Sequence, residues 1–296
     1  MRNFFILLII AFIVAIPVVT KTYEGKGQQS VRVIKDISYH PDFIGKAASS
    51  DPADTSRLLD LYLPGKSLTG SVPPLVVFIH GGAWLQGDKS DSPGLFLAER
   101  GYACASINYR LSTQKIFPAQ LEDCREAIRF LRKNAANYGY DGNRIAVWGN
   151  SAGGHLAALI GTTGDTNPGT EVKAVIDWCG LSNLESVANQ AGSRTILDYE
   201  TLDGPVARLL GGLVKDKQEL AKAASPVNFV NANDPPFLLL HGDIDNVVPY
   251  AQSEELARAL TKAQVPHKLL MIQRASHSLG GEEEISATLE FLKQNL

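Results

Sequence analysis

The sequence predicts an α/β fold, in which a mostly parallel sheet of about eight strands carries helices on both faces and a small helical cap insertion. After residue 22, short runs of apolar and β-branched residues alternate with longer segments of helical periodicity. This order is typical of a parallel sheet between two layers of helices. A chain of 296 residues, 45% of them hydrophobic, is long and apolar enough to bury one large core of this kind.

Eight runs of apolar and β-branched residues are expected to form the strands. The first two alternate apolar with polar side chains, as antiparallel strands at a sheet edge do. The later runs are almost continuously apolar, which indicates strands covered on both faces. In chain order the runs are Val31–Tyr39, Arg57–Leu63, Leu75–Ile79, Tyr102–Asn108, Arg144–Trp148, Val172–Trp178, Phe237–Leu240 and Lys268–Ile272.

Segments with helical periodicity lie between or after these runs. Apolar residues recur with the spacing of one helix face in Ala119–Ala136, Ser253–Ala263 and Glu283–Leu292. Residues 182–224 show no strand pattern and form too long a stretch for a compact connection, so they are expected to be the cap insertion. The folded domain is expected to span residues 30–296.

The amino terminus differs from the rest of the chain. Met1-Arg2-Asn3 precedes an almost unbroken apolar run from Phe4 to Val19. A basic start before such a run is typical of a secretory signal, whereas a full membrane span usually needs about 20 apolar residues. We therefore expect residues 1–22 to be a signal peptide or an N-terminal membrane anchor. The protein is expected to be exported, as a periplasmic or secreted protein, with membrane attachment through residues 4–19 as the alternative to cleavage.

Charge and cysteine usage exclude several classes of partner. The chain has 28 basic and 31 acidic residues, a formal charge of -3, and no basic run with interleaved aromatic residues, so no nucleic-acid partner is expected. The three cysteines, Cys104, Cys124 and Cys179, cannot all pair within one chain, and none lies in a Cys-x-x-Cys spacing. Neither a metal site nor a disulfide framework is expected.

The strongest functional motif is Gly149-Asn150-Ser151-Ala152-Gly153. It follows the apolar run Ile145–Trp148 and opens the helical run Gly154–Leu159. A sharp turn from strand to helix projects the central serine into a cleft, and glycines are needed because the strand and the helix approach closely. The new helix also directs its N-terminal amides at the same place. The pentapeptide is common by chance, but its position at this junction makes Ser151 a candidate nucleophile.

A second motif, His80-Gly81-Gly82-Ala83-Trp84, follows the strand Leu75–Ile79. Glycines there let backbone N–H groups face a ligand, and such donors stabilise the oxyanion that forms in acyl transfer. The expected donors are the amides of Gly82, Ala83 and Ala152. The alternative is an ordinary glycine turn after a strand. Trp84 is a candidate substrate-binding residue in the acyl pocket, and packing is an equally good interpretation.

A serine nucleophile needs a base and a carboxylate that holds the base in the correct tautomer. Asp245 lies in the loop after the run Phe237–Leu240, and His277 lies after the last predicted strand. The chain order serine, acid, histidine is that of the α/β-hydrolase fold. Asp243 is the competitor for the acid. Ser151, Asp245 and His277 are therefore the expected catalytic residues.

The other histidines receive structural interpretations. His80 is expected to brace the donor loop, His155 to pack within the nucleophile helix, and His241 to fix the acid loop. His40 and His267 are expected at the surface or at strand ends.

Several further motifs from about Arg57 onward support a family assignment. They are Leu59-Asp60-Leu61-Tyr62-Leu63-Pro64, the His80–Trp84 motif, Asn108-Tyr109-Arg110-Leu111, Phe117-Pro118-Ala119-Gln120-Leu121-Glu122-Asp123, the Gly149–His155 turn, and the Asp245 and His277 loops. In these motifs the chain resembles the BD-FAE family of bacterial carbohydrate esterases, within the hormone-sensitive-lipase-like and lipase/esterase group of α/β-hydrolases. The resemblance covers most of the chain.

The resemblance implies an extracytoplasmic esterase that acts on acetyl or feruloyl groups carried by plant polysaccharide. The implied partner is a small-molecule or polysaccharide-linked ester, with no metal and no organic cofactor. One residue departs from the pattern, since lipase-like relatives often place a third glycine where this chain has Ala83. Relatives with His-Gly-Gly-x-Trp include arylformamidases, so the acyl group stays open.

Three alternatives to an esterase remain. An arylformamidase or another amidase would use the same site. A peptidase of the prolyl-oligopeptidase type shares the serine, acid and histidine order, but it normally carries a large propeller domain before the catalytic one. A non-catalytic binding protein that keeps the fold usually lacks one of the three catalytic residues, and all three candidates occur here.

Overall fold

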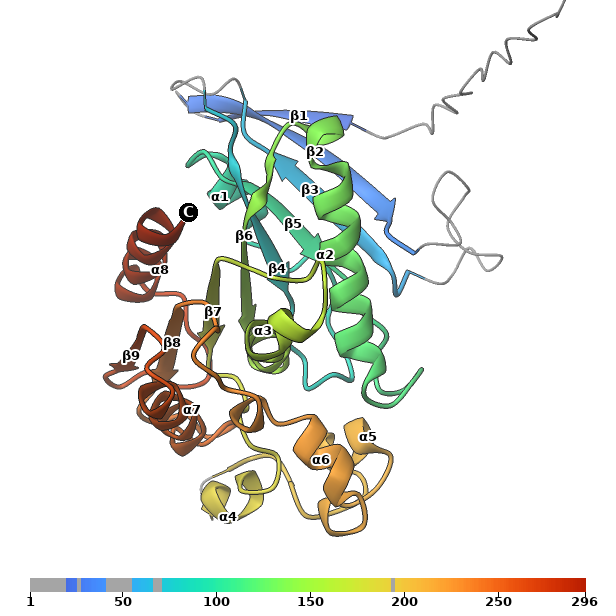
Figure 1. The fold of residues 1–296 in the computed structure, drawn as a ribbon, viewed down its shortest axis with the longest axis vertical. Helices are drawn as coiled ribbons and strands as arrows, with labels where there is room; N and C mark the ends of the chain where they lie inside the picture. Colours follow the sequence, from blue (N-terminus) through green and yellow to red (C-terminus); the bar gives the residue numbers. More distant parts are fainter. Residues whose placement is uncertain (1–19, 26–27, 41–54, 66–70, 193–194) are drawn as a thin grey trace, which may run out of the picture.

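A computed structural model describes residues 20–25, 28–40, 55–65, 71–192 and 195–296 (Figure 1). In this part of the chain, nine strands form one sheet in the order β1-β2-β3-β5-β4-β6-β7-β8-β9. The pairs from β1 to β5 along this order are antiparallel, and all the pairs from β5 to β9 are parallel. The bounds are β1 Thr20–Gly25, β2 Gln28–Ser38, β3 Leu58–Leu63, β4 Pro74–Ile79, β5 Ala103–Ile107, β6 Asp141–Asn150, β7 Ala174–Trp178, β8 Phe237–Gly242 and β9 His267–Ile272.

The sheet has one strand more than the sequence predicts, because β1 pairs with β2 at the edge. The folded domain therefore includes residues before the expected start at residue 30, and residues 20–22 of the expected leader belong to the sheet. The apolar run 4–19 lies outside the described residues. Among the helices that are described, none is long and apolar enough to cross a membrane.

Helices cover both faces of the sheet (Figure 1). On one face lie α1 (Gly94–Ala98) and α8 (Glu282–Asn295), and on the other lie α2 (Ala119–Tyr138), α3 (Ala152–Thr163) and α7 (Ala251–Lys262). The helices predicted from periodicity are all present, with ends that differ by a few residues.

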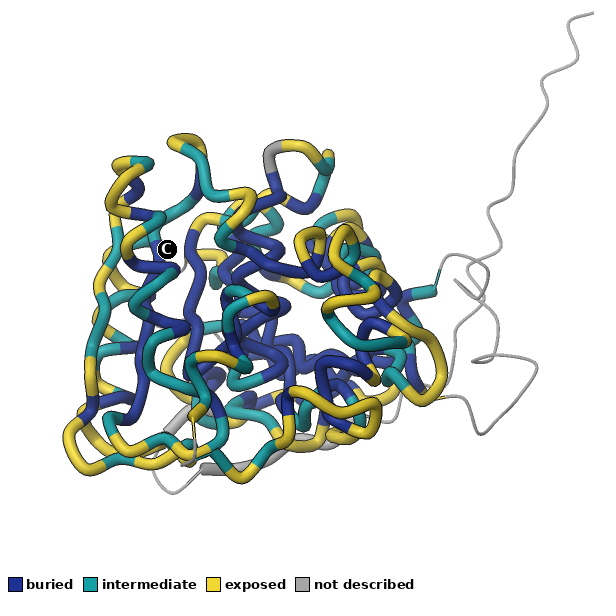
Figure 2. The backbone as a smooth tube through the Cα atoms, turned by 90° about the horizontal axis from the view of Figure 1, so that it is seen from below, coloured by how far each residue is buried: buried dark blue, intermediate teal, exposed yellow. Residues whose placement is uncertain are grey.

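Two hydrophobic clusters correspond to the two faces. In β4, Leu75, Val77 and Ile79 belong to the cluster that packs against α2 and α3, while Val76 and Phe78 belong to the cluster with residues of α1 and α8. Successive side chains of a strand point to opposite faces, so a strand covered on both sides must be apolar throughout. This explains the continuous apolar runs in the sequence. Figure 2 shows the buried segments running through the middle of the molecule and the exposed residues concentrated in the surrounding turns.

The antiparallel strand β3 is buried along its whole length, although its sequence alternates apolar and polar residues. Its polar residue Asp60 is 1% exposed, and Lys89 offsets the buried charge with Nζ 2.7 Å from Oδ1 of Asp60. The same Nζ lies 2.8 Å from Oδ1 of Asp36, at a bulge of β2. The alternation in β3 thus reflects a buried ion pair rather than a solvated face.

The expected cap insertion is present between β7 and β8. It contains three short helices, α4 (Val187–Ala191), α5 (Pro205–Leu210) and α6 (Gln218–Ala223), which lie together at one end of the sheet (Figure 1). No strand forms in the described part of this segment. The three cysteines are buried and free.

Candidate active site

Ser151 stands at the turn between β6 and α3, in a strained backbone conformation. Its φ is 55° and its ψ is -120°, values that a residue with a side chain rarely adopts. The backbone N–H of Ser151 donates to the carbonyl oxygen of Trp178 at 2.7 Å, which ties the turn to the end of β7. Strain of this kind persists only where the surroundings enforce it.

The glycines on either side of Ser151 explain how the turn is enforced. A Cβ added at Gly149 would lie 2.2 Å from the backbone of Gly153, and one added at Gly153 would lie 2.0 Å from the carbonyl oxygen of Ile79. No side chain fits at either position. The strand, the helix and the end of β4 can therefore approach one another only with glycine at both positions, as the sequence analysis predicts.

The turn borders a cavity of about 270 Å³. Its lining comes from segments that are far apart in the sequence: the loop after β4, the turn itself, the cap, and the loops after β8 and β9. Ser151 and His277 both line it, although they are 126 positions apart in the chain. The carboxyl ends of neighbouring parallel strands meet at one edge of a sheet, so this convergence follows from the topology.

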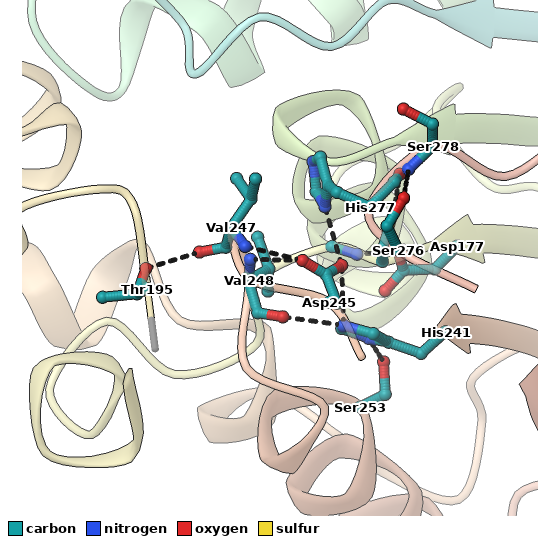
Figure 3. A network of polar contacts seen from close by, with 12 residues as sticks. Asp177, Thr195, His241, Asp245, Val247, Val248, Ser253, Ser276, His277 and Ser278 are labelled. Carbon is teal, nitrogen blue, oxygen red and sulfur yellow. Dashed lines mark hydrogen bonds and ion pairs between the residues drawn. The ribbon is translucent and has the colours of Figure 1, made fainter. Parts of the chain in front are cut away.

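Asp245 and His277 form a hydrogen-bonded pair. Nδ1 of His277 donates to Oδ2 of Asp245 at 2.7 Å (Figure 3). The Asp245 side chain is fully buried, whereas that of His277 is 21% exposed and reaches the cavity. With Nδ1 engaged as a donor, Nε2 of the neutral imidazole is left as an acceptor.

The surroundings of Asp245 favour its ionised form. Burial on its own raises the pKa of the carboxyl. Hydrogen bonds from His241, His277 and the backbone N–H of Val247 lower it by more than burial raises it, so the pKa lies well below its usual range. Oδ1 accepts the backbone N–H groups of Val247 at 2.8 Å and of Val248 at 2.9 Å. The carboxylate is thus held as an anion in a fixed orientation.

The competing acid, Asp243, lies elsewhere. Its backbone N–H donates to the carbonyl oxygen of Ile272, and its buried Oδ1 has no hydrogen-bond partner within the described residues. Asp245 is the carboxylate that contacts His277.

Residues of the loop after β4 line the cavity. Gly82, Ala83 and Trp84 all have positive φ, at 104°, 55° and 59°, and a Cβ at Gly82 would lie 2.2 Å from the carbonyl oxygen of Gln86. Gly82, Ala83 and Ala152 line the cavity, and no hydrogen bond among the described residues uses their backbone N–H groups. Three unengaged amides therefore lie around the cavity that Ser151 lines.

His80 braces this loop, as the sequence predicts. Its ring stacks on Tyr109 with centroids 4.4 Å apart, and its Nδ1 donates to the carbonyl oxygen of Gly81 at 2.8 Å. Burial lowers the pKa of His80, which favours the neutral ring. Tyr109 in turn donates its hydroxyl to the carbonyl oxygen of His80 at 3.1 Å.

Both interpretations of Trp84 have support. The side chain is 1% exposed and packs edge-on against His155, with centroids 5.1 Å apart, yet Trp84 also lines the cavity. His155 is a packed core residue whose Nε2 lies 2.6 Å from the carbonyl oxygen of Ala224, and burial lowers its pKa to about 4. Trp84 thus lines the cavity while its ring packs against the buried His155.

The cap contributes residues that the sequence analysis missed. Leu197, Tyr199 and Pro205 line the cavity. The hydroxyl of Tyr199 donates to the carbonyl oxygen of Val247 at 2.7 Å. The backbone N–H of Ile196 donates to the carbonyl oxygen of Asn246 at 2.8 Å. The cap is therefore bonded to the loop that carries Asp245. No local pattern in the cap sequence indicates these contacts, because they depend on how two distant segments meet.

One group of side chains in the described residues has metal-ligand geometry. Possible ligand atoms of Cys179, Asp245 and His277 lie within 4.8 Å of one another. Burial raises the pKa of the Cys179 thiol well above its ordinary value, and a metal requires the thiolate. Asp245 and His277 are already bonded to each other. The donors fit an acid–histidine pair better than a metal site.

Comparisons with known proteins identify the family of the chain. A family model described as BD-FAE matches residues 59–260, more than half of the chain. The chain belongs to the BD-FAE family. Esterase LipQ of Mycobacterium tuberculosis is 34% identical to it over 223 residues, which are 72% of this chain and 51% of LipQ. The chain thus spans about half the length of this curated relative.

Two solved structures share the fold of this chain. A truncated carbohydrate esterase from gut microbiota has a TM-score of 0.76 and 29% identity, with 89% of this chain and 95% of that chain covered. An acetyl ester-xyloside bifunctional hydrolase from Caldicellulosiruptor lactoaceticus has a TM-score of 0.67 and 26% identity, with 88% and 93% covered. These likenesses confirm the α/β-hydrolase fold and the family resemblance that the sequence predicts.

Proposed function

We propose that this BD-FAE protein is a carboxylic ester hydrolase that works through an acyl-enzyme on Ser151, with His277 as the general base and Asp245 as the orienting acid. The observation that carries the proposal is the 2.7 Å hydrogen bond between His277 and Asp245, in a pair that reaches the cavity lined by Ser151. Relatives and structural neighbours named as esterases support the same reaction class.

The reaction follows from the arrangement of these groups. His277 takes the proton of the Ser151 hydroxyl as Oγ attacks the ester carbonyl, and Asp245 stabilises the imidazolium that forms. The amides of Gly82, Ala83 and Ala152 stabilise the oxyanion, each contributing a factor of about 10²–10³ in rate.

Turnover then proceeds by loss of the alcohol and attack by water. The imidazolium gives its proton to the leaving alcohol, which leaves the acyl group on Ser151. The neutral imidazole next activates a water, which releases the acid and restores the hydroxyl. Only the neutral ring can accept a proton, so His277 must be neutral at the start of each step in which it acts as a base.

The test of this reaction is the Ser151→Ala variant. It should lose hydrolysis of a short-chain p-nitrophenyl ester while its thermal unfolding midpoint stays close to that of the wild type. Retained turnover in a purified variant would refute the assignment of the nucleophile.

We propose acetyl or feruloyl esters of carbohydrate as the substrate class. Two of the structural neighbours are named as a carbohydrate esterase and as an acetyl ester-xyloside hydrolase, which supports this class. Side-by-side assays on acetylated xylan, methyl ferulate and N-formylkynurenine test it. A kcat/KM that is highest on the formamide would replace the proposal with an arylformamidase.

We also propose that the protein is exported. The basic start and the apolar run 4–19 support this. N-terminal sequencing of the protein recovered from cell fractions is the test. Recovery from the cytosol with an intact amino terminus would contradict export.

A further inference from the structure

His241, the last but one residue of β8, contacts Asp245 from the side opposite His277 (Figure 3). Nε2 of His241 lies 3.2 Å from Oδ2 of Asp245, the same oxygen that accepts the hydrogen bond from Nδ1 of His277. The same Nε2 lies 2.9 Å from the carbonyl oxygen of Val248. Both neighbours are acceptors, so Nε2 must carry a hydrogen.

The other ring nitrogen of His241 has a matched partner. Nδ1 lies 2.7 Å from Oγ of Ser253, which belongs to α7. A serine hydroxyl can donate to an imidazole nitrogen, so Nδ1 needs no hydrogen of its own. The Ser253 hydroxyl and the Val248 carbonyl together select the tautomer in which Nε2 carries the hydrogen, between the Val248 carbonyl and Oδ2 of Asp245.

Burial makes these contacts strong. The His241 ring is inaccessible to solvent, Ser253 is 1% exposed, and the Asp245 side chain is fully buried. Tyr250 packs edge-on against the ring, with centroids 5.6 Å apart. Water cannot replace a lost donor in such a place, so each contact contributes more than it would at the surface.

The four donors account for the whole carboxylate. Oδ1 accepts the N–H groups of Val247 and Val248, and Oδ2 lies between His277 and His241. A carboxylate has about four acceptor positions, and these four N–H groups surround both of its oxygens. Without His241, nothing else in this set restrains Oδ2 on the side away from His277.

We propose that His241 is a positioning residue for the acid: its Nε2–H holds Oδ2 of Asp245 toward His277, and Ser253 fixes the tautomer that makes this possible. The inference rests on the proposed function, in which Asp245 orients the base. His241 touches neither the substrate nor the reacting atoms. It acts on the rate through Asp245, and so affects kcat rather than substrate binding.

The test compares His241→Leu with His241→Gln, using a p-nitrophenyl ester and the full chain. Leucine fills the space without a donor, whereas the amide of glutamine can place an N–H near the position of Nε2. We expect kcat to fall by about 10- to 100-fold in the leucine variant, as for the loss of one hydrogen bond to a charged group, with KM little changed. The glutamine variant should recover most of this loss.

A serine pair supplies a second test that perturbs the fold less. Ser253→Ala should lower kcat by a smaller factor than His241→Leu. Ser225→Ala is the matched control, because Ser225 is also buried and hydrogen-bonded, to the carbonyl oxygen of Ala221, but lies away from the acid. It should leave kcat unchanged.

The outcomes separate this inference from the function it rests on. Turnover that survives Ser151→Ala refutes the proposed function itself. If Ser151→Ala is inactive, a folded His241→Leu variant with the kcat of the wild type overturns the inference, and so do leucine and glutamine variants that are equally slow. If the leucine variant does not fold, equal kcat values for Ser253→Ala and Ser225→Ala overturn it.

Discussion

The nucleophile turn and the acid loop are held in place in different ways. At the turn, backbone is packed against backbone, and a Cβ at Gly149 or Gly153 would come within about 2.2 Å of another chain segment. In the acid loop, Asp245 is placed by hydrogen bonds to side chains and amides, and the cap is bonded to the same loop through Tyr199. The serine is thus positioned by sterics, and its partners by polar contacts.

This difference determines how each region should respond to substitution. A side chain added at Gly149 or Gly153 has no room, so such a change should disrupt both the fold and the activity. Hydrogen bonds can be removed one at a time, so changes in the acid loop should reduce activity in steps while the fold persists. The substitutions below test this contrast, from the largest expected effect to the smallest.

Asp245→Asn should have the largest effect on rate. Asparagine keeps an oxygen for the amides of Val247 and Val248 but removes the charge that orients and stabilises the imidazolium of His277. We expect kcat to fall by about 10⁴-fold with little change in unfolding temperature. Steady-state kinetics and calorimetry check this. Asp243→Asn is the control and should stay close to wild type. If Asp243→Asn is the slower variant, the acid has been misassigned.

Gly153→Ala should have the largest effect on stability. The new Cβ would meet the carbonyl oxygens of Ile79 and His80 at 2.0 and 2.7 Å, so α3 and β4 must move apart. We expect a loss of more than about 3 kcal/mol in the free energy of unfolding. Gly164→Ala is the control, because its φ is -65° and its nearest contact would be an ordinary 3.4 Å. Equal denaturation midpoints for the two variants would contradict a sterically determined turn.

The buried carboxyl of Asp177, which lies close to Gly154 of α3, should make the stability of the protein depend on pH. Burial raises its pKa to about 7, although the N–H of Gly180 and the nearby His241 oppose the shift. The unfolded carboxyl titrates near 3.8. Between these values only the folded state holds the proton, so the contribution of Asp177 to stability falls as pH rises from about 4 to about 7.

Asp177→Asn tests this, because asparagine can still accept the N–H of Gly180 and does not titrate. Denaturant unfolding at several pH values should show the free energy of unfolding of the variant rising relative to that of the wild type between about pH 4 and pH 7. The total gain should be on the order of 4 kcal/mol. A difference between the two proteins that does not change with pH would show that the buried carboxyl is ionised throughout.

Tyr199→Phe should have the smallest effect and the most specific one. It removes the hydroxyl that bonds the cap to Val247, at a cost of about 1 kcal/mol in stability, and loosens the loop that holds Asp245. Tyr140→Phe is the matched control, since its buried hydroxyl also donates to a backbone carbonyl, that of Leu131, at 2.7 Å. Both variants should have a lower unfolding temperature than the wild type, but only Tyr199→Phe should lower kcat. Equal kcat values for the two variants would show that the bond between the cap and Val247 does not help to hold Asp245.

The contrast between the two regions also explains what the sequence could predict. The Gly-x-Ser-x-Gly turn is a local solution to a local steric problem, so its residues and its strand-to-helix position can be identified from a few neighbours. The parallel strands could be identified because burial on both faces leaves a continuous apolar run. Asp245 and His277 could be expected because they follow strands whose carboxyl ends meet.

What the sequence did not predict depends on contacts between distant segments. Nothing local marks Tyr199 as a partner of Val247, or Ser253 as a partner of His241. The sequence did not reveal β1, which follows the apolar run 4–19, since edge strands carry a weaker pattern than buried ones. Asp60 made β3 look like a solvated strand, although its charge is buried and offset by Lys89.

The most direct test of the central claim is to find which residue a mechanism-based inhibitor modifies. Treatment with an aryl dialkyl phosphate, followed by peptide mass spectrometry, should place a single phosphoryl adduct on Ser151. The same treatment should label Ser151 far more slowly in His277→Ala, because the hydroxyl then lacks its base. An adduct on another residue, or a protein that hydrolyses esters and stays unlabelled, would contradict the account.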